Sequence, residues 1–117
     1  MTGSAAMLAT VAELVAGDDD ADDILRAVVA ELVSSGTAVW AGIYFVEGGD
    51  LVLGPQAGTP EPDARTAVPV VYDGTQVADL AADRCDDHAL LAGVAGLVAI
   101  QCLVGWDTGG VPWDEAP

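Results

Sequence analysis

The chain has 117 residues, 52% of them hydrophobic, and its 19 acidic and 3 basic residues give a formal net charge of −16. This length suits one domain with a folded core. The charge repels polyanions and anionic membranes, so it excludes nucleic acids and membrane surfaces as partners. Acidic surfaces without lysine are typical of a halophilic-like protein or of a GC-rich genome, and a basic protein partner is the alternative interpretation.

Two helices are expected at the start of the chain. Residues 4–16 place apolar side chains on one helical face, with Ser4 as the N-cap and Gly17 after the last turn. Residues 20–34 carry a wide apolar stripe, and the aspartates that precede it favour the positive end of the helix dipole. The pattern therefore predicts two amphipathic helices in succession.

From residue 37 onward the apolar pattern alternates, which is typical of strands. We expect four strands that pair as two hairpins, at residues 37–46, 51–53, 66–72 and 75–81. The first strand has two faces, with Val39, Ala41, Ile43 and Phe45 on one and Trp40, Gly42, Tyr44 and Val46 on the other. Residues 54–63 are rich in proline and are expected to form a loop. Asp73-Gly74 favours a type I′ turn, and Pro69 predicts an edge strand or a bulge.

A third helix is predicted from Asp86 or Asp87 to about residue 104. The apolar run at residues 89–104 is shorter than the roughly 20 residues of a membrane span, so we expect a buried helix. Its small residues would let another backbone approach, which offers a surface for self-association. Residues 1–17 lack the features of a secretion signal, so a cytoplasmic location is expected.

This order of elements predicts an α+β fold, a small antiparallel sheet of two hairpins with the N- and C-terminal helices on one face. The segment 40–45, Trp-Ala-Gly-Ile-Tyr-Phe, with Leu-Val-Leu-Gly-Pro at 51–55, resembles the first hairpin of a GAF domain. It is nearest to the free methionine-(R)-sulfoxide reductase branch. Matches to the last GAF hairpin and the closing helix lie at residues 67–70, 73–74, 77–80 and 87–102. The resemblance implies a profilin-like GAF domain over residues 1–117, with its core at 20–104 and a tail at 105–117.

The connection between the two hairpins departs from the family pattern. GAF domains place there a long segment that covers a small-molecule pocket, and in the reductase branch this segment carries the reactive cysteines. Here residues 54–65 join the hairpins and contain no cysteine. The resemblance therefore implies a shortened GAF domain that has lost its lid.

The chain has two cysteines, Cys85 and Cys102, too few for a disulfide framework. Cys85 and His88 stand at a helix start, where the dipole lowers a thiol pKa and a histidine can act as base. Three acidic residues at the same place oppose thiolate formation: Asp83, Asp86 and Asp87. We expect a plain helix entrance there, and we expect Cys102 to be an inert core residue.

No metal and no cofactor are expected. His88 is the single histidine of the chain, so its neighbourhood lacks the converging ligands of a metal site. The aspartates at residues 18–23 resemble a calcium loop but lack the glycine and glutamate that such a loop needs. Residues 107–109 spell the Asp-Thr-Gly of aspartic proteases, but they stand too near the C-terminus and are read as a polar turn.

The candidate ligand-binding residues are Trp40, Gly42, Tyr44, Val68, Val70 and Tyr72. They are assigned to the sheet face away from the helices, where the resemblance places the ligand of a complete GAF domain. An exposed apolar face of this kind needs a cover. Three covers are open: the C-terminal tail with Trp106 and Trp113, a second copy of the chain, or a small uncharged or cationic ligand.

These observations predict a non-catalytic GAF-like domain in signalling, a homodimer that binds a small molecule or mediates an interaction. The alternative is an enzyme of the free methionine-(R)-sulfoxide reductase type that uses the thiol of Cys85 or Cys102. A third interpretation is an adaptor whose charge recognises a basic partner.

Overall fold

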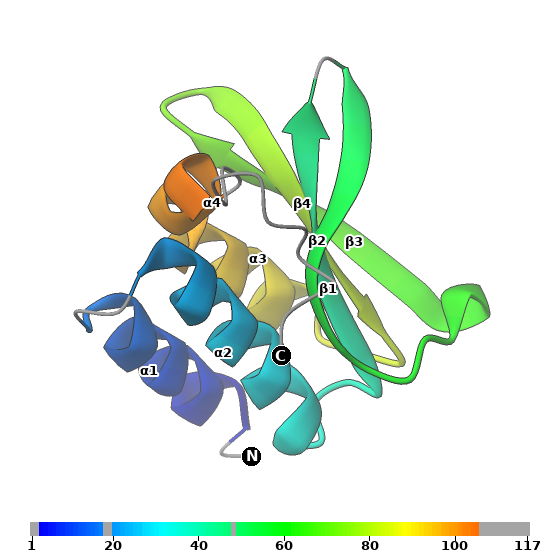
Figure 1. Ribbon diagram of the computed structural model, residues 1–117. Helices are drawn as coiled ribbons and strands as arrows, with labels where there is room; N and C mark the ends of the chain where they lie inside the picture. The colour runs from blue at the N-terminus through cyan, green and yellow to red at the C-terminus, as the bar shows by residue number, and fades with distance from the viewer. Residues whose placement is uncertain (1–2, 18–19, 48, 106–117) are drawn as a thin grey trace.

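The structure is a computed structural model and describes residues 3–17, 20–47 and 49–105 (Figure 1). Its α-helices are α1 (Gly3–Val15), α2 (Ala21–Ser34), α3 (His88–Leu97) and α4 (Ala99–Gly105). Its strands are β1 (Trp40–Glu47), β2 (Asp50–Gly58), β3 (Arg65–Tyr72) and β4 (Thr75–Asp83). A short 3-10 helix, η1 (Pro62–Ala64), lies between β2 and β3.

The strands form one antiparallel sheet in the order β2-β1-β4-β3, and the helices cover one face of it (Figure 1). The expected α+β architecture is confirmed. In the sheet, β1 and β4 are the central strands, so the two hairpins meet along a pairing that joins distant parts of the chain. Among the residues described, no helix is both long and apolar enough to cross a membrane.

The core fills the space between the sheet and the helices. Ala41, Ile43 and Phe45 of β1 are buried there, which confirms the face assigned to them. Helix α2 contributes the buried side of its apolar stripe: Ile24, Leu25, Val28, Val29 and Leu32. Because β1 alternates, Trp40, Gly42 and Tyr44 point to the other side of the sheet.

The second hairpin has the predicted turn and edge. Asp73 and Gly74 have φ angles of 53° and 78°, the two positive values that a type I′ turn requires. Pro69 lies in the edge strand β3, and the register between β3 and β4 shifts at Val70/Val71. Both expectations for Pro69 are therefore met.

Several element boundaries differ from the expectations, and strand β1 begins at Trp40 instead of residue 37. Strand β2 runs to Gly58 instead of ending at residue 53, because it is an edge strand that tolerates Pro55 and because it bulges opposite Ile43. Strand β4 extends two residues further, to Asp83. Helix α1 begins at Gly3, so Ser4 lies inside the helix instead of capping it.

The third predicted helix is divided in two. Asp87 caps α3, since its carboxylate accepts a hydrogen bond from the backbone N–H of Leu90 at 2.9 Å. The backbone at Val98 departs from helical dihedral angles (φ −98°, ψ 6°), and this residue separates α3 from α4. The small side of α3 packs within the molecule: a Cβ on Gly93 would lie 2.8 Å from the side chain of Leu8 in α1. This part of the surface expected to serve self-association is therefore used by α1.

Candidate functional site

The site lies on the sheet face away from the helices and begins with Trp40 and Tyr44. Their ring centroids are 6.5 Å apart, and the rings are inclined at 55°. Gly42 stands between them because a Cβ there would lie 2.5 Å from the Trp40 ring. Trp40 is only 1% exposed, so this ring is buried although it lies outside the main core. The sequence correctly placed these three residues on one face.

Two side chains from other strands contact the Trp40 ring. The indole Nε1 donates a hydrogen bond to Gln56 Oε1 at 3.0 Å, from the neighbouring strand β2. The guanidinium carbon of Arg65 lies 4.2 Å from the ring centroid, a cation–π geometry. Arg65 also donates from Nη1 to the Tyr44 hydroxyl at 3.1 Å. The arginine thus joins both aromatic side chains.

Asp83 is the anionic partner of this arginine. Its side chain is 0% exposed, and it accepts from Arg65 Nε at 2.7 Å and from Arg65 Nη2 at 3.0 Å. The backbone N–H of Glu61 donates to the same carboxylate at 2.6 Å. Hydrogen bonds from Arg65 hold the pKa of Asp83 below its usual range. The carboxylate therefore stays charged at neutral pH despite its burial.

Sheet register explains why these residues meet. Trp40 pairs with Asp83 between β1 and β4, and Arg65 pairs with Asp83 between β3 and β4. The three residues form a row across one end of the sheet, all on the same face. We call Trp40, Tyr44 and Asp83 the cation cage, because they contact the guanidinium of Arg65 with one aromatic face, a hydroxyl and a carboxylate.

The segment 59–64 runs past this end of the sheet from one edge strand to the other. The N–H of Thr59 donates to the carbonyl of Val39, and the N–H of Arg84 donates to the carbonyl of Ala64. Arg84 Nε also lies 2.6 Å from Glu61 Oε1. Backbone and ionic contacts therefore fix the short connection to the ends of β1 and β4.

Not all of the expected ligand-binding residues lie here. Val68 and Val70 are 2% and 0% exposed and belong to the core between sheet and helices. Their partners in β4, Leu80 and Ala78, face the same core, so assigning the two valines to the Trp40 face was wrong. Tyr72 is exposed at the far end of β3, beyond the bulge. The structure brings together Trp40, Gly42 and Tyr44 from the predicted set.

Sequence reasoning missed Gln56, Arg65 and Asp83. Gln56 stands in a segment expected to be a loop, and Asp83 lies beyond the expected end of its strand. A signal for Arg65 was present in the sequence, because the chain has only 3 basic residues against 19 acidic ones and Arg65 is one of the three. The expected tail cover with Trp106 and Trp113, and the motif at 107–109, fall outside the described residues.

Both cysteine thiols are buried, with Cys85 5% and Cys102 1% exposed. Burial raises the pKa of Cys85, and it raises the pKa of Cys102 to about 12. Cys85 lines an open cleft of about 720 Å³ beside the ends of β3 and β4, together with Val39, Asp63, Ala64, Arg65, Thr66, Arg84 and Asp86. Because the thiolate is the reactive form, neither cysteine has the environment of an activated nucleophile.

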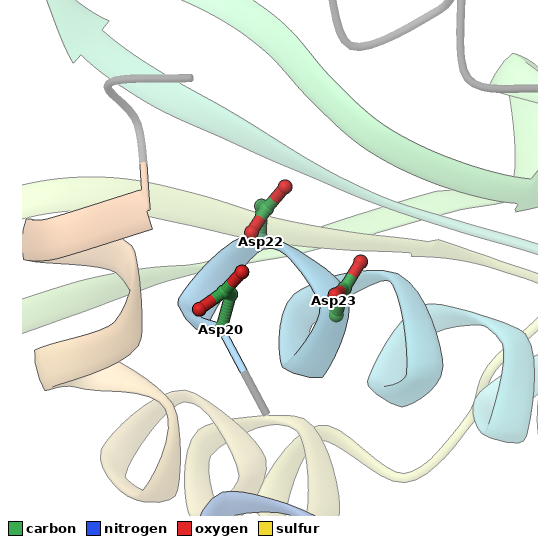
Figure 2. Close-up of side chains that lie close together, drawn as sticks. All are labelled: Asp20, Asp22 and Asp23. Carbon is green, nitrogen blue, oxygen red and sulfur yellow. The ribbon is translucent and has the colours of Figure 1, made fainter. Parts of the chain in front are cut away.

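A cluster of carboxylates stands at the start of α2. Figure 2 shows Asp20, Asp22 and Asp23, each of which places one carboxylate oxygen within 4.8 Å of the others. Arg26 compensates part of this charge, since its Nη1 lies 3.3 Å from Asp22 and 3.9 Å from Asp23. This cluster therefore has a structural explanation, as charge that favours the helix N-terminus and pairs with Arg26.

No protein-family model matches the chain, and no curated protein sequence matches it. Solved structures do. The free methionine-R-sulfoxide reductase of Neisseria meningitidis, in complex with its substrate, has a TM-score of 0.75 at 19% identity, over 89% of this chain and 90% of that chain. The GAF domain of a Coxiella burnetii phosphoenolpyruvate-protein phosphotransferase has a TM-score of 0.73 at 12% identity, over 94% and 98%. The chain has the GAF fold.

A second reductase of this kind, from Staphylococcus aureus, also in complex with its substrate, has a TM-score of 0.67 at 17% identity, over 86% of this chain and 95% of that chain. The resemblance inferred from the first hairpin is thereby confirmed at the level of the fold. Enzymes and GAF domains of a phosphotransferase share this fold, so the fold alone assigns no activity. The choice between an enzyme and a non-catalytic domain therefore has to rest on the side chains of the site.

Proposed function

We propose that this chain is a non-catalytic GAF domain that binds a small molecule on the Trp40 face of its sheet and acts as a sensory or interaction module in cytoplasmic signalling. The observation that carries the proposal is the cation cage. A fully buried carboxylate beside two aromatic rings, on the face away from the helices, supports a role in recognition of a small molecule.

The buried thiols support the non-catalytic part of the proposal. Reduction of a sulfoxide by thiols requires a reactive cysteine, which becomes oxidised as the sulfoxide becomes a thioether. Raised pKa values at Cys85 and Cys102 disfavour the thiolate that would begin this step. The enzymatic alternative is favoured by the likeness to two methionine-sulfoxide reductases, and Cys85 is its candidate nucleophile because it lines the open cleft.

One assay separates the two functions. The protein is incubated with free methionine-(R)-sulfoxide and dithiothreitol, and the methionine formed is measured by amino-acid analysis. We expect no methionine above the level without protein. Turnover that disappears in Cys85→Ser and persists in Cys102→Ser would refute the non-catalytic function and identify the nucleophile.

We also propose that the homodimer forms along the edge strand β2. Leu51 and Val52 are 51% and 44% exposed there, and an unpaired apolar edge favours pairing with another strand. Light scattering after gel filtration is expected to give twice the mass of one chain, in high salt that screens the charge of −16. Leu51→Asp should restore the single-chain mass, and a single-chain mass for the native protein in high salt would refute the dimer.

A further inference from the structure

The cation cage already holds a cation that belongs to the chain itself. The guanidinium of Arg65 lies 4.2 Å from the centre of the Trp40 ring, and two of its nitrogen atoms donate to Asp83. A third nitrogen donates to the Tyr44 hydroxyl. An aromatic face, a carboxylate that accepts two parallel hydrogen bonds and a hydroxyl acceptor are the groups by which proteins recognise guanidinium and ammonium ligands.

Burial differs between the two members of the ion pair. The Asp83 side chain is 0% exposed, whereas the Arg65 side chain is 25% exposed. The carboxylate therefore forms the floor of the site, and the guanidinium lies closer to solvent. Arg65 begins the edge strand β3, directly after η1, whereas Asp83 lies in the central strand β4, so the arginine is the member of the pair nearer to the rim of the sheet.

The charge of the whole chain favours a cationic ligand at this place. With a net charge of −16, the protein attracts small cations and repels anions over its entire surface. Moving Arg65 out of the cage would leave Asp83 as an unpaired buried carboxylate, which strongly favours replacement by another cation. A neutral or anionic molecule would not compensate the negative charge of Asp83.

We propose that Arg65 is an internal occupant of a cation site made by Trp40, Tyr44 and Asp83, and that a small organic cation with a guanidinium or primary ammonium group binds there when Arg65 moves out. This inference rests on the proposed function and names the ligand class of the same face. Arg65 competes with the ligand, so the apparent affinity of the native chain equals the intrinsic affinity multiplied by the fraction of molecules in which Arg65 has left the cage.

The test uses methylguanidinium chloride at millimolar concentration, with sodium chloride at equal ionic strength as the reference. The variant is Arg65→Ala, which vacates the cage. Arg84→Ala is the matched control, because Arg84 is 62% exposed and pairs with Glu61 outside the cage. The readouts are the NMR resonance of the Trp40 indole N–H, assigned with Trp40→Phe, and the midpoint of thermal unfolding.

In Arg65→Ala we expect a saturable shift of the Trp40 resonance and a rise in the unfolding midpoint that sodium chloride does not produce. The native chain and Arg84→Ala should need at least about tenfold more methylguanidinium for the same effect, because Arg65 occupies the site. Arg65→Ala combined with Asp83→Asn should show no saturable shift.

Three results would overturn the inference: no saturable binding to Arg65→Ala, equal affinity of Arg65→Ala and the native chain, or unchanged affinity after Asp83→Asn is added. If Arg65→Ala does not fold alone, the same titration becomes a folding assay, in which recovery by methylguanidinium supports the site and no recovery refutes it. Failure of this test leaves the non-catalytic function standing, whereas sulfoxide turnover would refute that function and leave the cage result intact.

Discussion

Replacing Arg65 by alanine should lower the free energy of unfolding more than the removal of any other exposed or half-exposed charged side chain. Asp83 is 0% exposed and would keep its charge without the hydrogen bonds at 2.7 and 3.0 Å that Arg65 supplies. Removing one partner of a buried ion pair costs about 3–5 kcal/mol. Because the Arg65 side chain is 25% exposed, water replaces part of what is lost, and we expect a loss near the lower limit, about 3 kcal/mol.

Asp83→Asn should be milder, about 1–2 kcal/mol, because the amide oxygen still accepts from the Glu61 N–H and the freed Arg65 reaches water. The double variant should lose less than the sum of the two. Urea unfolding followed by circular dichroism at pH 7 measures all three free energies, with the exposed Arg84→Ala as a control expected to lose under about 1 kcal/mol. An Arg65→Ala loss no larger than that of the control, or additivity within about 0.5 kcal/mol, would refute this account of the pair.

Four further outcomes are expected. The pKa of Asp83 is lowered in the folded state by its ion pair, so its contribution to stability is present above the ordinary value of 3.8 and is lost as pH falls below it; the stability difference between the native chain and Asp83→Asn should therefore shrink in acid unfolding curves. With its pKa raised to about 12, the Cys102 thiol should react with Ellman's reagent only in urea, and reaction of the folded chain at the rate of free cysteine would contradict its burial. Gly42→Ala should displace the Trp40 ring, whose atoms lie 2.5 Å from the new Cβ, and shift the indole resonance, whereas Gly96→Ala, with nothing within 4 Å, should not. Added potassium chloride should raise the thermal midpoint by screening the charge of −16, and a midpoint indifferent to salt would exclude a halophilic-like surface.

The fold was predictable because its signals are local. Alternation in β1 identified which side chains enter the core, and Asp73-Gly74 identified the second hairpin by the dihedral angles that glycine and aspartate tolerate. Strand β2 was predicted too short because Pro55 usually ends a strand, and only its edge position and the bulge opposite Ile43 make it acceptable there. Pro69 indicated the edge position of β3, but Pro55 was interpreted as a strand end instead of as the same signal for an edge in β2.

Only the part of the site that depends on local signals was predictable. Trp40 and Tyr44 follow from alternation within one strand, but Asp83 and Arg65 join them through the pairing of β1 with β4 and of β4 with β3. Such pairing links residues far apart in sequence, and a shift of one residue in register moves every side chain to the other face. Val68 was assigned to the wrong face because its register with β4 could not be read from the strand alone.

The placement of the three arginines connects the acidity of the chain to its site. Each of them contacts a carboxylate, and two of the three hold the segment that joins the hairpins: Arg65 through Asp83 and Arg84 through Glu61. The Arg84 pair is exposed, so salt weakens it, whereas the Asp83 pair is buried and keeps most of its strength. If added salt raises the thermal midpoint as expected, it stabilises the acidic fold as a whole while it weakens one of the two ion pairs on this segment. Under those conditions the Arg65–Asp83 pair becomes the main ionic restraint on the connection, beside the backbone hydrogen bonds of Thr59, Glu61 and Arg84, which do not depend on the Arg65 guanidinium.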